Sequence, residues 1–363
     1  MEKHINVDLL IIGGGVNGAG IARDAAGRGL AVMLCEQGDL AGATSSASSK
    51  LIHGGLRYLE YYRFGFVRAA LREREVLLGI APHIVWPARF ILPHDKGLRP
   101  AFVIEAGLFL YDCLSPRKSL DRSHRLDLRA AKEGAPLKDH LTTGFAYSDC
   151  RVDDARLVVL NAVDARERGA SIRTRTRCVS AKREGGMWRA TFLDAREATA
   201  TTVMARALVN AAGPWAAEVA NIVNGRDADK RLRLVKGSHI VVPRVYEGDQ
   251  SYVLQNEDRR IIFAMPYEQN YTLIGTTEIP FEGDPLTARI SEYEIVYLCA
   301  AVSRYFRKPP SPTDVAGSFS GVRPLYDDGA KNASAATREY VLDLDAPEGS
   351  APLLSVFGGK ITT

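Results

Sequence analysis

The chain has 363 residues with a formal net charge of +4, and 46% of its residues are hydrophobic. That length is enough for two domains that each bury a core, and the modest charge, with no Lys/Arg block, gives little support to nucleic-acid binding. No stretch reaches the roughly 18 apolar residues of a membrane-spanning helix, because the best candidate, residues 101–114, is interrupted by Glu105 and Asp112.

The cysteines and the N-terminus indicate a cytoplasmic protein. The five cysteines are scattered without a CxxC pair, which is typical of reduced thiols and not of a disulfide framework or a zinc site, so we expect no metal. The N-terminus carries Glu2 and Asp8 and leads directly into a glycine cluster, without the charged, apolar and cleavage regions of a signal peptide.

The first part of the chain predicts a strand, a helix and a second strand, at residues 7–12, 16–28 and 31–35. Residues 38–55 follow and are dense in Ser, Ala and Gly, which predicts a functional loop. Residues 57–120 have a mainly helical pattern that four prolines divide into pieces. These prolines are Pro82, Pro87, Pro93 and Pro100.

The second half of the chain alternates between helical and strand periodicity. A helix is predicted over residues 153–168, with Gly169 as its C-cap. Strands are predicted next, followed by an antiparallel sheet between residues 232 and 276 that belongs to a second domain. The predicted strands are residues 171–179, 188–193, 207–210, 239–242, 261–265 and 271–274. Residues 291–306 have a helical pattern, and residues 317–357 return to short strands and loops.

The glycine cluster predicts a dinucleotide site. Residues 13–18, Gly-Gly-Gly-Val-Asn-Gly, match G-x-G-x-x-G between a predicted strand and a predicted helix, and Glu36 ends the next strand. Gly13 permits the tight turn, Gly15 lets the backbone approach a pyrophosphate, and Gly18 allows close helix packing. Glu36 suits ribose hydroxyls and would repel a 2′-phosphate, which disfavours NADP. The alternative is a glycine turn that only packs a helix on a sheet.

The segment after Glu36 favours FAD over NAD. Residues 41–50, Ala-Gly-Ala-Thr-Ser-Ser-Ala-Ser-Ser-Lys, offer backbone groups and hydroxyls that suit a larger cofactor, where a simple nicotinamide domain would continue into another helix. A flexible serine linker is the alternative, and the position of this segment between two well-patterned regions argues against it.

At this point the chain resembles the family of FAD-dependent glycerol-3-phosphate dehydrogenases. The resemblance rests on the glycine loop and on residues 43–58, and it covers nearly the whole chain. Further matching motifs are residues 147–154 (YSDCRVDD), 236–239 (KGSH), 254–258 (LQNED), 321–324 (GVRP) and 355–360 (SVFGGK).

The resemblance implies an α/β fold with a discontinuous, doubly wound (Rossmann-like) FAD-binding domain and a second, antiparallel-sheet substrate domain. The expected FAD domain comprises residues 1–60, 145–230 and 318–363, and the substrate-binding or cap domain comprises residues 61–144 and 231–317. In the family, the Gly-Gly-Lys signature continues into a helix and a C-terminal helical domain, whereas this chain stops at Thr363. We therefore expect a shortened chain without that domain.

The family reaction oxidises sn-glycerol 3-phosphate to dihydroxyacetone phosphate by hydride transfer from C2 to the flavin, in glycerol and glycerophospholipid catabolism and respiration. The resemblance implies that the electrons pass to a membrane quinone from a peripheral position on the inner face of the cytoplasmic membrane. A glycerol-3-phosphate oxidase that uses O2 and a noncatalytic flavin-binding regulator are the alternatives. A homodimer is compatible with the sequence, which does not determine the oligomeric state.

The membrane expectation has one weak signal in the sequence itself. Residues 57–74 mix Tyr61, Tyr62, Phe64 and Phe66 with three arginines, a composition compatible with an interfacial helix. We expect these aromatic residues to be buried in the core instead.

A phosphate dianion removed from water needs several cations, because a single lysine offsets the desolvation cost only marginally. The resemblance implies Arg57, Arg323, Arg338 and Lys360 for this role, with Tyr58 orienting the substrate; for each cation alone, a solvated surface charge is the alternative. The proton acceptor should be a histidine with a pKa near the operating pH. We favour His239 over His53, with Arg323 also assigned to catalysis, and a structural role is the alternative for either histidine.

The expected cofactor contacts come from the glycine loop, the serine-rich segment and three later turns. The residues expected to contact FAD are Gly13, Gly14, Gly15, Asn17, Gly18, Glu36, Thr44, Ser45, Ser46, Ser49, Lys50, Leu51, His53, Val179, Gly213, Gly359 and Lys360.

Overall fold

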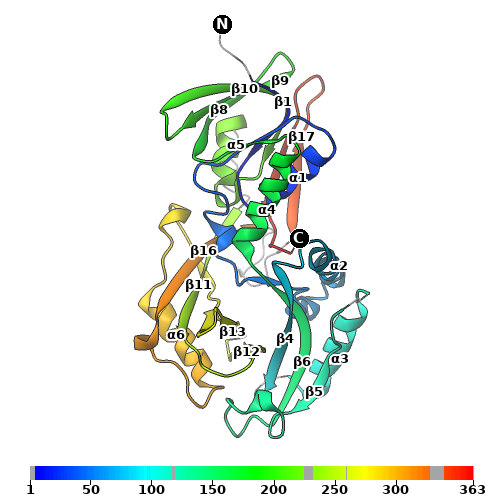
Figure 1. The fold of residues 1–363 in the computed structure, drawn as a ribbon, viewed down its shortest axis with the longest axis vertical. Helices are drawn as coiled ribbons and strands as arrows, with labels where there is room; N and C mark the ends of the chain where they lie inside the picture. The colour runs from blue at the N-terminus through cyan, green and yellow to red at the C-terminus, as the bar shows by residue number, and fades with distance from the viewer. Residues whose placement is uncertain are drawn as a thin grey trace.

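The computed structural model describes residues 5–95, 97, 99–116, 119–224, 232–258, 260–327 and 339–362. These residues form two lobes, each built on one large β-sheet (Figure 1). The chain passes between the lobes several times, so each sheet is assembled from segments that are far apart in the sequence.

The first sheet has eight strands and a parallel centre. At its centre, β1 (Ile5–Ile12) pairs in parallel with β2 (Val32–Cys35) and with β10 (Thr199–Asn210). The strand order is β17 (Tyr340–Asp345), β18 (Leu353–Gly358), β10, β1, β2, β7 (Ser171–Arg173), with β9 (Met187–Asp194) paired to β10 and β8 (Thr176–Glu184) paired to β9.

Helix α1 (Val16–Gly27) packs closely on this sheet because its buried face consists of small residues. Gly18 is one of them, and a Cβ atom at this position would overlap the carbonyl oxygen of Gly13. Ala19 of α1 packs with Val158 of α4 (Asp154–Glu167), whose C-terminal end is followed by Gly169 at φ 95°. Helix α5 (Ala216–Asn224) packs against β8 and β18.

The second sheet has ten strands and is antiparallel except where β12 (Ser251–Gln255) meets β4 (Val85–His94). Its order is β15 (Ile279–Pro280), β11 (Leu232–Pro243), β14 (Tyr271–Gly275), β13 (Ile261–Tyr267), β12, β4, β6 (Thr143–Val152), β3 (Leu51–Ile52), with β16 (Gly317–Tyr326) on β11 and β5 (His124–Asp127) on β6. Helix α6 (Glu292–Ser303) covers one face, with Leu298 packed into a core that includes Ile240 and Tyr252.

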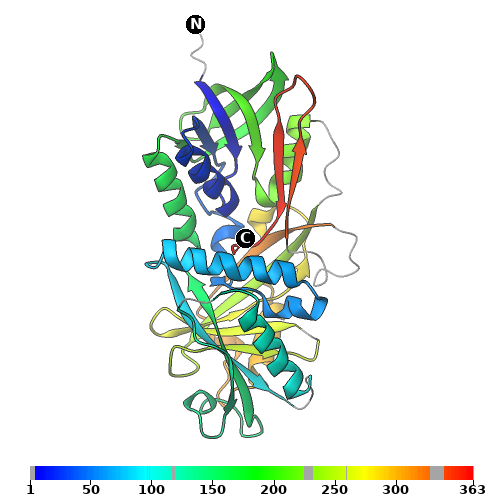
Figure 2. The same cartoon turned by 90° about the vertical axis from the view of Figure 1, so that its right-hand side faces the viewer.

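Two further helices pack on the other side of this sheet. Helix α2 (Phe64–Ile80) crosses the molecule between the two lobes, with α3 (Ala101–Cys113) beyond it (Figure 2). Leu71 of α2 and Tyr111 of α3 are buried with Phe90 and Phe145 of the sheet. Short 3₁₀ turns occur at η1 (Thr44–Ser46), η2 (Leu56–Tyr61), η3 (Lys132–Gly134), η4 (Gly213–Trp215), η6 (Pro285–Thr287) and η7 (Pro312–Asp314).

The α/β fold with a partly parallel sheet and a second antiparallel sheet is confirmed, and so are the predicted helices at 16–28, 153–168 and 291–306. The mainly helical reading of residues 57–120 is wrong at β4, a strand that contains Pro87 and Pro93. One edge of β4 pairs with β6 along its whole length, and the other edge pairs with β12 only at Phe90 and Ile91. Because most of this second edge is unpaired, the missing N–H groups of the prolines cost little.

The sheet topology differs from the predicted domain boundaries at three strands. β3, β6 and β16 lie wholly or mostly within the predicted FAD-domain segments, yet all three are hydrogen-bonded in the second sheet. Strand order depends on pairing between distant segments, which local pattern does not encode. Within the described residues, no helix is long and apolar enough to cross a membrane.

Candidate active site between the two sheets

A cavity of about 690 Å³ connects the first sheet with the second. At one end it is bordered by Gly13, Glu36 and Gly213, which follow the carboxyl ends of β1, β2 and β10. At the other end it is bordered by Phe263 of β13 and Arg323 of β16. The cavity therefore lies where open α/β sheets bind ligands and continues onto the second sheet.

The glycine loop has the backbone geometry of a phosphate cradle. Gly13 has φ 114°, and a Cβ atom there would overlap the carbonyl of Ala211. Gly15 is the N-cap of α1 and has no side-chain cap, so the positive end of the helix faces the cavity that Gly15 and Asn17 border. Only a residue without a side chain allows this approach, which explains the spacing of the motif.

Glu36 is held at the end of β2 by two backbone donors. Its Oε2 atom accepts a hydrogen bond from the Gly14 N–H at 2.7 Å, and its Oε1 atom accepts one from the Gly38 N–H at 2.7 Å. Glu36 also borders the cavity. The carboxylate is therefore fixed beside the glycine loop, where it can accept hydrogen bonds from a ribose.

The serine-rich segment is anchored to both lobes and is not a flexible linker. The Thr44 hydroxyl donates to the carbonyl of Val322 in β16 at 2.6 Å. The Ser45 Oγ atom accepts from the N–H of Val16 at 3.0 Å, which ties η1 to the first turn of α1. On the far side, Lys50 forms an ion pair with Asp154 at 2.7 Å. The segment thus connects the dinucleotide end of the cavity to the second sheet.

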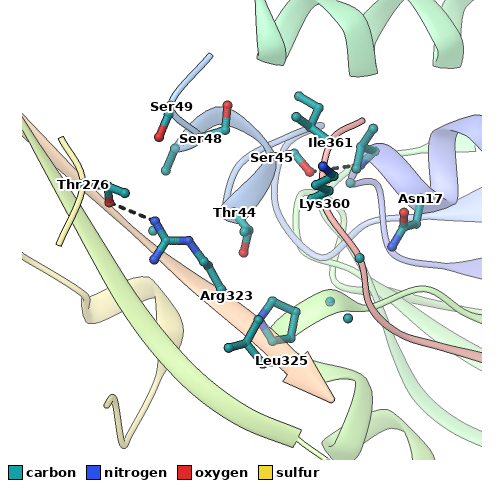
Figure 3. A pocket seen from close by; sticks show the side chains of 18 of the residues that line it. Asn17, Thr44, Ser45, Ser48, Ser49, Thr276, Arg323, Leu325, Lys360 and Ile361 are labelled. Carbon is teal, nitrogen blue, oxygen red and sulfur yellow. Dashed lines mark hydrogen bonds between the residues drawn. The ribbon is translucent and has the colours of Figure 1, made fainter. Parts of the chain in front are cut away.

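Arg323 points into the cavity from β16. Its Nη2 atom donates to the Thr276 hydroxyl at 2.9 Å and its Nη1 atom to the Thr277 carbonyl at 3.3 Å; Figure 3 shows the Thr276 contact. The guanidinium lies over Gly237, where a Cβ atom would overlap it. A side chain at Gly237, in the KGSH motif, would therefore displace the guanidinium from this position.

Two other predicted cations border the same cavity. Lys360 donates from Nζ to the carbonyl of His53 at 3.1 Å, and its Nζ atom lies 4.6 Å from the ring centre of Phe66. Arg57 and Tyr58 of η2 are also cavity residues. Arg338 lies outside the described residues. Folding therefore brings Arg57, Arg323 and Lys360 to one cavity although more than 250 positions separate the first from the second.

The two histidines occupy different places. His53 borders the cavity, and burial together with the charges of Lys360 and Arg74 lowers its pKa to about 3. His239 is fully buried and is not among the described residues that border the cavity. Its Nε2 atom lies 2.9 Å from the Oγ atom of Ser49, which does border the cavity, and its ring stacks on Phe319.

The pKa of His239 is also lowered to about 3, first by burial and then by the charges of Arg323 and Lys50. Both histidines are therefore neutral at pH 7. Their pKa values lie below the range expected for a base poised near neutrality. A phosphate dianion bound among the cations would raise both pKa values, because negative charge stabilises the imidazolium.

Most of the residues expected to contact a cofactor border the cavity, and five do not. Gly14, Gly18, Ser46, Lys50 and Val179 are not among its described lining residues. Gly14 and Lys50 instead hold Glu36 and Asp154 in place. Val179 is 46% exposed at a bulge of β8, next to Cys178, which does border the cavity.

The structure adds cavity residues that sequence reasoning missed. Gln255, Phe263, Thr276 and Glu278 border the cavity from the second sheet. Gln255 lies in the LQNED motif, and Thr276 and Glu278 follow a predicted strand. The ends of predicted strands could therefore have indicated these three positions. Their strands had to be paired before these positions converged.

Exposed aromatic and aliphatic side chains surround the mouth of the cavity. Tyr62 is 80% exposed and Phe64 is 39% exposed, and both border the cavity together with Val103 and Leu110 of α3. The expected burial of the aromatic residues at 61–66 is therefore wrong except at Phe66: Tyr61, Tyr62 and Phe64, at the end of η2 and the start of α2, are exposed.

Comparisons with known proteins agree with this architecture. A family model described as FAD dependent oxidoreductase matches residues 8–363. The chain is 57% identical to a D-erythritol 1-phosphate dehydrogenase of Brucella abortus over 100% of this chain and 72% of that protein. It is 56% identical to a glycerol-3-phosphate dehydrogenase of Pseudomonas aeruginosa over 98% of this chain and 69% of that protein.

A solved structure has the same fold. It is a glycerol-3-phosphate dehydrogenase from Bacillus halodurans in complex with FAD, with 30% sequence identity and a TM-score of 0.74. The match covers 99% of this chain and 62% of the solved chain. This chain thus spans about two thirds of the length of the proteins that it matches.

Proposed function

The chain belongs to the FAD dependent oxidoreductase family, and on that premise we propose that it oxidises sn-glycerol 3-phosphate to dihydroxyacetone phosphate in the cavity between its two sheets. The observation that carries the proposal is that Arg57, Arg323 and Lys360 border the same cavity as the dinucleotide loop. A cofactor site and a phosphate site therefore share one space.

The residues of the cavity fit FAD. Gly13 and Gly15 place no side chain at the start of α1, where a pyrophosphate would lie, and the helix dipole of α1 favours its negative charge. Glu36 would hold the ribose, and the segment at residues 44–53 would line the flavin. When bound, FAD supplies the ring that accepts the hydride from C2 of the substrate.

The cations would hold the phosphate. One cation about 4 Å from an anion returns roughly 4 kcal/mol at an effective dielectric of 20, which is comparable to the desolvation cost of a single charge. Three cations are therefore better matched to a phosphate dianion than one. Arg323 is the best placed for a two-point grip, since its contacts with Thr276 and Thr277 fix the plane of the guanidinium.

The proton of the substrate hydroxyl would be transferred toward His239 through Ser49. The Ser49 hydroxyl borders the cavity and lies within hydrogen-bond distance of the imidazole, so it would accept the substrate proton as it donates its own to Nε2. The imidazole is neutral at pH 7 and is therefore available as an acceptor. His53, from its place on the cavity wall, would orient the substrate.

A second candidate substrate is D-erythritol 1-phosphate. The identity to the Brucella abortus enzyme, 57%, is as high as the identity to the Pseudomonas aeruginosa enzyme, 56%. Both compounds are phosphate monoesters of a polyol, so the three cations suit either. The choice between them depends on groups that contact the hydroxyls, among which Gln255, Thr276 and Glu278 are suitably polar.

The proposed electron acceptor is a membrane quinone, reached from a peripheral position on the membrane. Exposed apolar residues support this proposal: Tyr62 borders the cavity, and Phe102 and Phe109 lie on α3, the helix that contributes Val103 and Leu110 to the cavity lining. Tyr62, Phe102 and Phe109 are each at least 68% exposed. An acceptor that enters at the cavity mouth would reach the flavin end directly. A glycerol-3-phosphate oxidase would share the same substrate residues and differ in its use of O2.

The test is an anaerobic absorbance titration of the chain reconstituted with FAD. Bleaching of the flavin by sn-glycerol 3-phosphate, and not by lactate, would support the proposal, and a parallel titration with D-erythritol 1-phosphate would rank the two substrates. Flavin that binds but stays oxidised with both phosphate esters would overturn it. Reoxidation by a soluble quinone compared with O2 then separates dehydrogenase from oxidase.

A further inference from the structure

A buried charged cluster lies behind the cavity wall, formed by three elements of the second lobe. The Tyr111 hydroxyl of α3 donates to the carboxylate of Asp149 in β6, at 2.7 Å from Oδ2. Arg74 of α2 donates to Oδ1 of the same carboxylate at 2.7 Å and to the Ser148 carbonyl at 3.1 Å. All three side chains are at most 1% exposed, and none is among the described residues that border the cavity.

The cluster ends on the backbone of the turn at residues 53–58, which leads from β3 into the first half of η2. The Gly54 N–H donates to the Tyr111 hydroxyl at 2.8 Å, so that one oxygen links the turn to Asp149. Gly54 has no room for a side chain, because a Cβ atom would lie 2.5 Å from Leu71 and 2.6 Å from the Tyr111 hydroxyl. The backbone of the turn therefore lies directly against Leu71 and the Tyr111 hydroxyl.

This turn carries a large part of the cavity wall. His53 precedes Gly54, and Arg57 and Tyr58 follow it, and all three border the cavity. Lys360 is attached to the same turn through the carbonyl of His53. Two of the three proposed phosphate-binding cations thus depend on where this turn lies.

A contribution to folding stability does not by itself explain why such a cluster is present. A buried ion pair loses much of its Coulombic gain to desolvation, and well-packed apolar residues in its place are often equally stable. An ion pair and a hydroxyl also make directional contacts. Here the Tyr111 hydroxyl makes such a contact with a single backbone N–H, that of Gly54.

We propose that Tyr111, held by Asp149 and Arg74, is a positioning residue that fixes the turn at residues 53–58 and with it the phosphate-binding end of the cavity. The role as phosphate positioner rests on the function proposed above. The fixing of the turn itself depends only on the contacts between Tyr111, Gly54 and Asp149.

The test is Tyr111→Phe, which keeps the ring and removes the hydroxyl. Tyr246→Phe is the matched control, because the buried Tyr246 hydroxyl donates to the carbonyls of Gln250 and Ala264 in the second lobe and is not among the described residues that border the cavity. Both variants should lose similar thermal stability. In Tyr111→Phe alone, we expect the amides of residues 51–58 to exchange faster with deuterium and KM for sn-glycerol 3-phosphate to rise about tenfold with a smaller change in kcat.

The proposal is overturned if Tyr111→Phe matches the control in both amide exchange and KM. If the wild-type flavin is not reduced by any polyol phosphate, the proposed function has failed instead. In that case amide exchange at residues 51–58, measured on the FAD-loaded protein, still decides whether Tyr111 fixes the turn. Should Tyr111→Phe not fold, Asp149→Asn keeps an acceptor for the hydroxyl but loses the ion pair with Arg74, and so tests the hold on Tyr111. Faster amide exchange at residues 51–58 in this variant would support the proposal, and unchanged exchange would overturn it.

Discussion

The Nε2 atom of His239 lies 2.9 Å from the Oγ atom of Ser49, and this contact joins a fully buried imidazole to the cavity. The two residues are 190 positions apart, and the KGSH strand and the serine-rich segment meet at this point. Through it, a histidine that does not reach the cavity can still take part in a proton transfer there.

If Ser49 and His239 act as one unit, Ser49→Ala and His239→Gln should each slow anaerobic flavin reduction by about 10²-fold, and the double variant should be no slower than either single variant. Stopped-flow absorbance measures the rates. Ser303→Ala is the control, since its hydroxyl donates to the Ala300 carbonyl on α6 and Ser303 is not a described cavity residue. Additive losses in the double variant would contradict a shared path.

Replacement of Arg323 by lysine should weaken substrate binding. Lysine keeps the charge but loses the fork that contacts both Thr276 and Thr277, so KM should rise at least about tenfold. Arg233→Lys is a suitable control, because Arg233 pairs with Asp327 at the surface of a neighbouring strand. Steady-state kinetics with both variants at equal flavin content decide the outcome, and an unchanged KM for Arg323→Lys would exclude Arg323 from phosphate binding.

Glu36 should matter for the cofactor and not for the substrate. In Glu36→Gln the fixed carboxylate is lost and one side-chain atom becomes a donor facing the Gly14 or Gly38 N–H, so the Kd for FAD should rise about tenfold. Fluorescence quenching on FAD binding measures this Kd. Glu184→Gln, at an exposed ion pair with Arg189 on the first sheet, should leave the Kd unchanged.

Stability should fall as the pH drops below about 6.5. The pKa values of His53 and His239 are lowered from 6.5 to about 3, so the unfolded chain takes up protons that the folded chain does not. Their contribution is complete above pH 6.5 and is lost progressively as the pH falls toward 3. Each histidine should add up to about 1.4 kcal/mol per pH unit to the slope of the unfolding free energy.

Urea unfolding between pH 7 and 5 measures this slope, in a range where most carboxylates remain ionised. The double variant His53→Gln, His239→Gln should show a shallower dependence. An identical slope in the variant would mean that neither histidine has a depressed pKa in the folded protein.

The exposed apolar residues Tyr62, which borders the cavity, and Phe102, on the adjoining helix α3, should bind lipid. Co-sedimentation with anionic phospholipid vesicles should fall several-fold in the variant Tyr62→Ser, Phe102→Ser. Leu344→Ser removes an apolar residue of similar exposure, 63%, from the edge of the first sheet and should have no effect. Equal sedimentation of all three proteins would contradict a membrane contact at these residues.

Much of the fold and of the dinucleotide site could be predicted from the sequence, because both are encoded by local pattern. The spacing of Gly13, Gly15 and Gly18 reflects backbone approach and helix packing, and Glu36 follows from where the next strand ends. The prediction failed where local pattern and environment disagree: β4 contains two prolines yet forms a strand, since most of one edge of it is unpaired.

By itself the sequence determined the cofactor loop, the alternation of strands and helices, and the set of residue types for a phosphate site. Only the tertiary structure decided that Arg57, Arg323 and Lys360 border one cavity, that His239 lies behind Ser49, and that Tyr111 holds the turn at Gly54. The reason is physical: the Ser49–His239 and Gly54–Tyr111 contacts join positions 190 and 57 residues apart, and which distant strands pair is set by packing of the whole molecule, not by the residues of either segment alone.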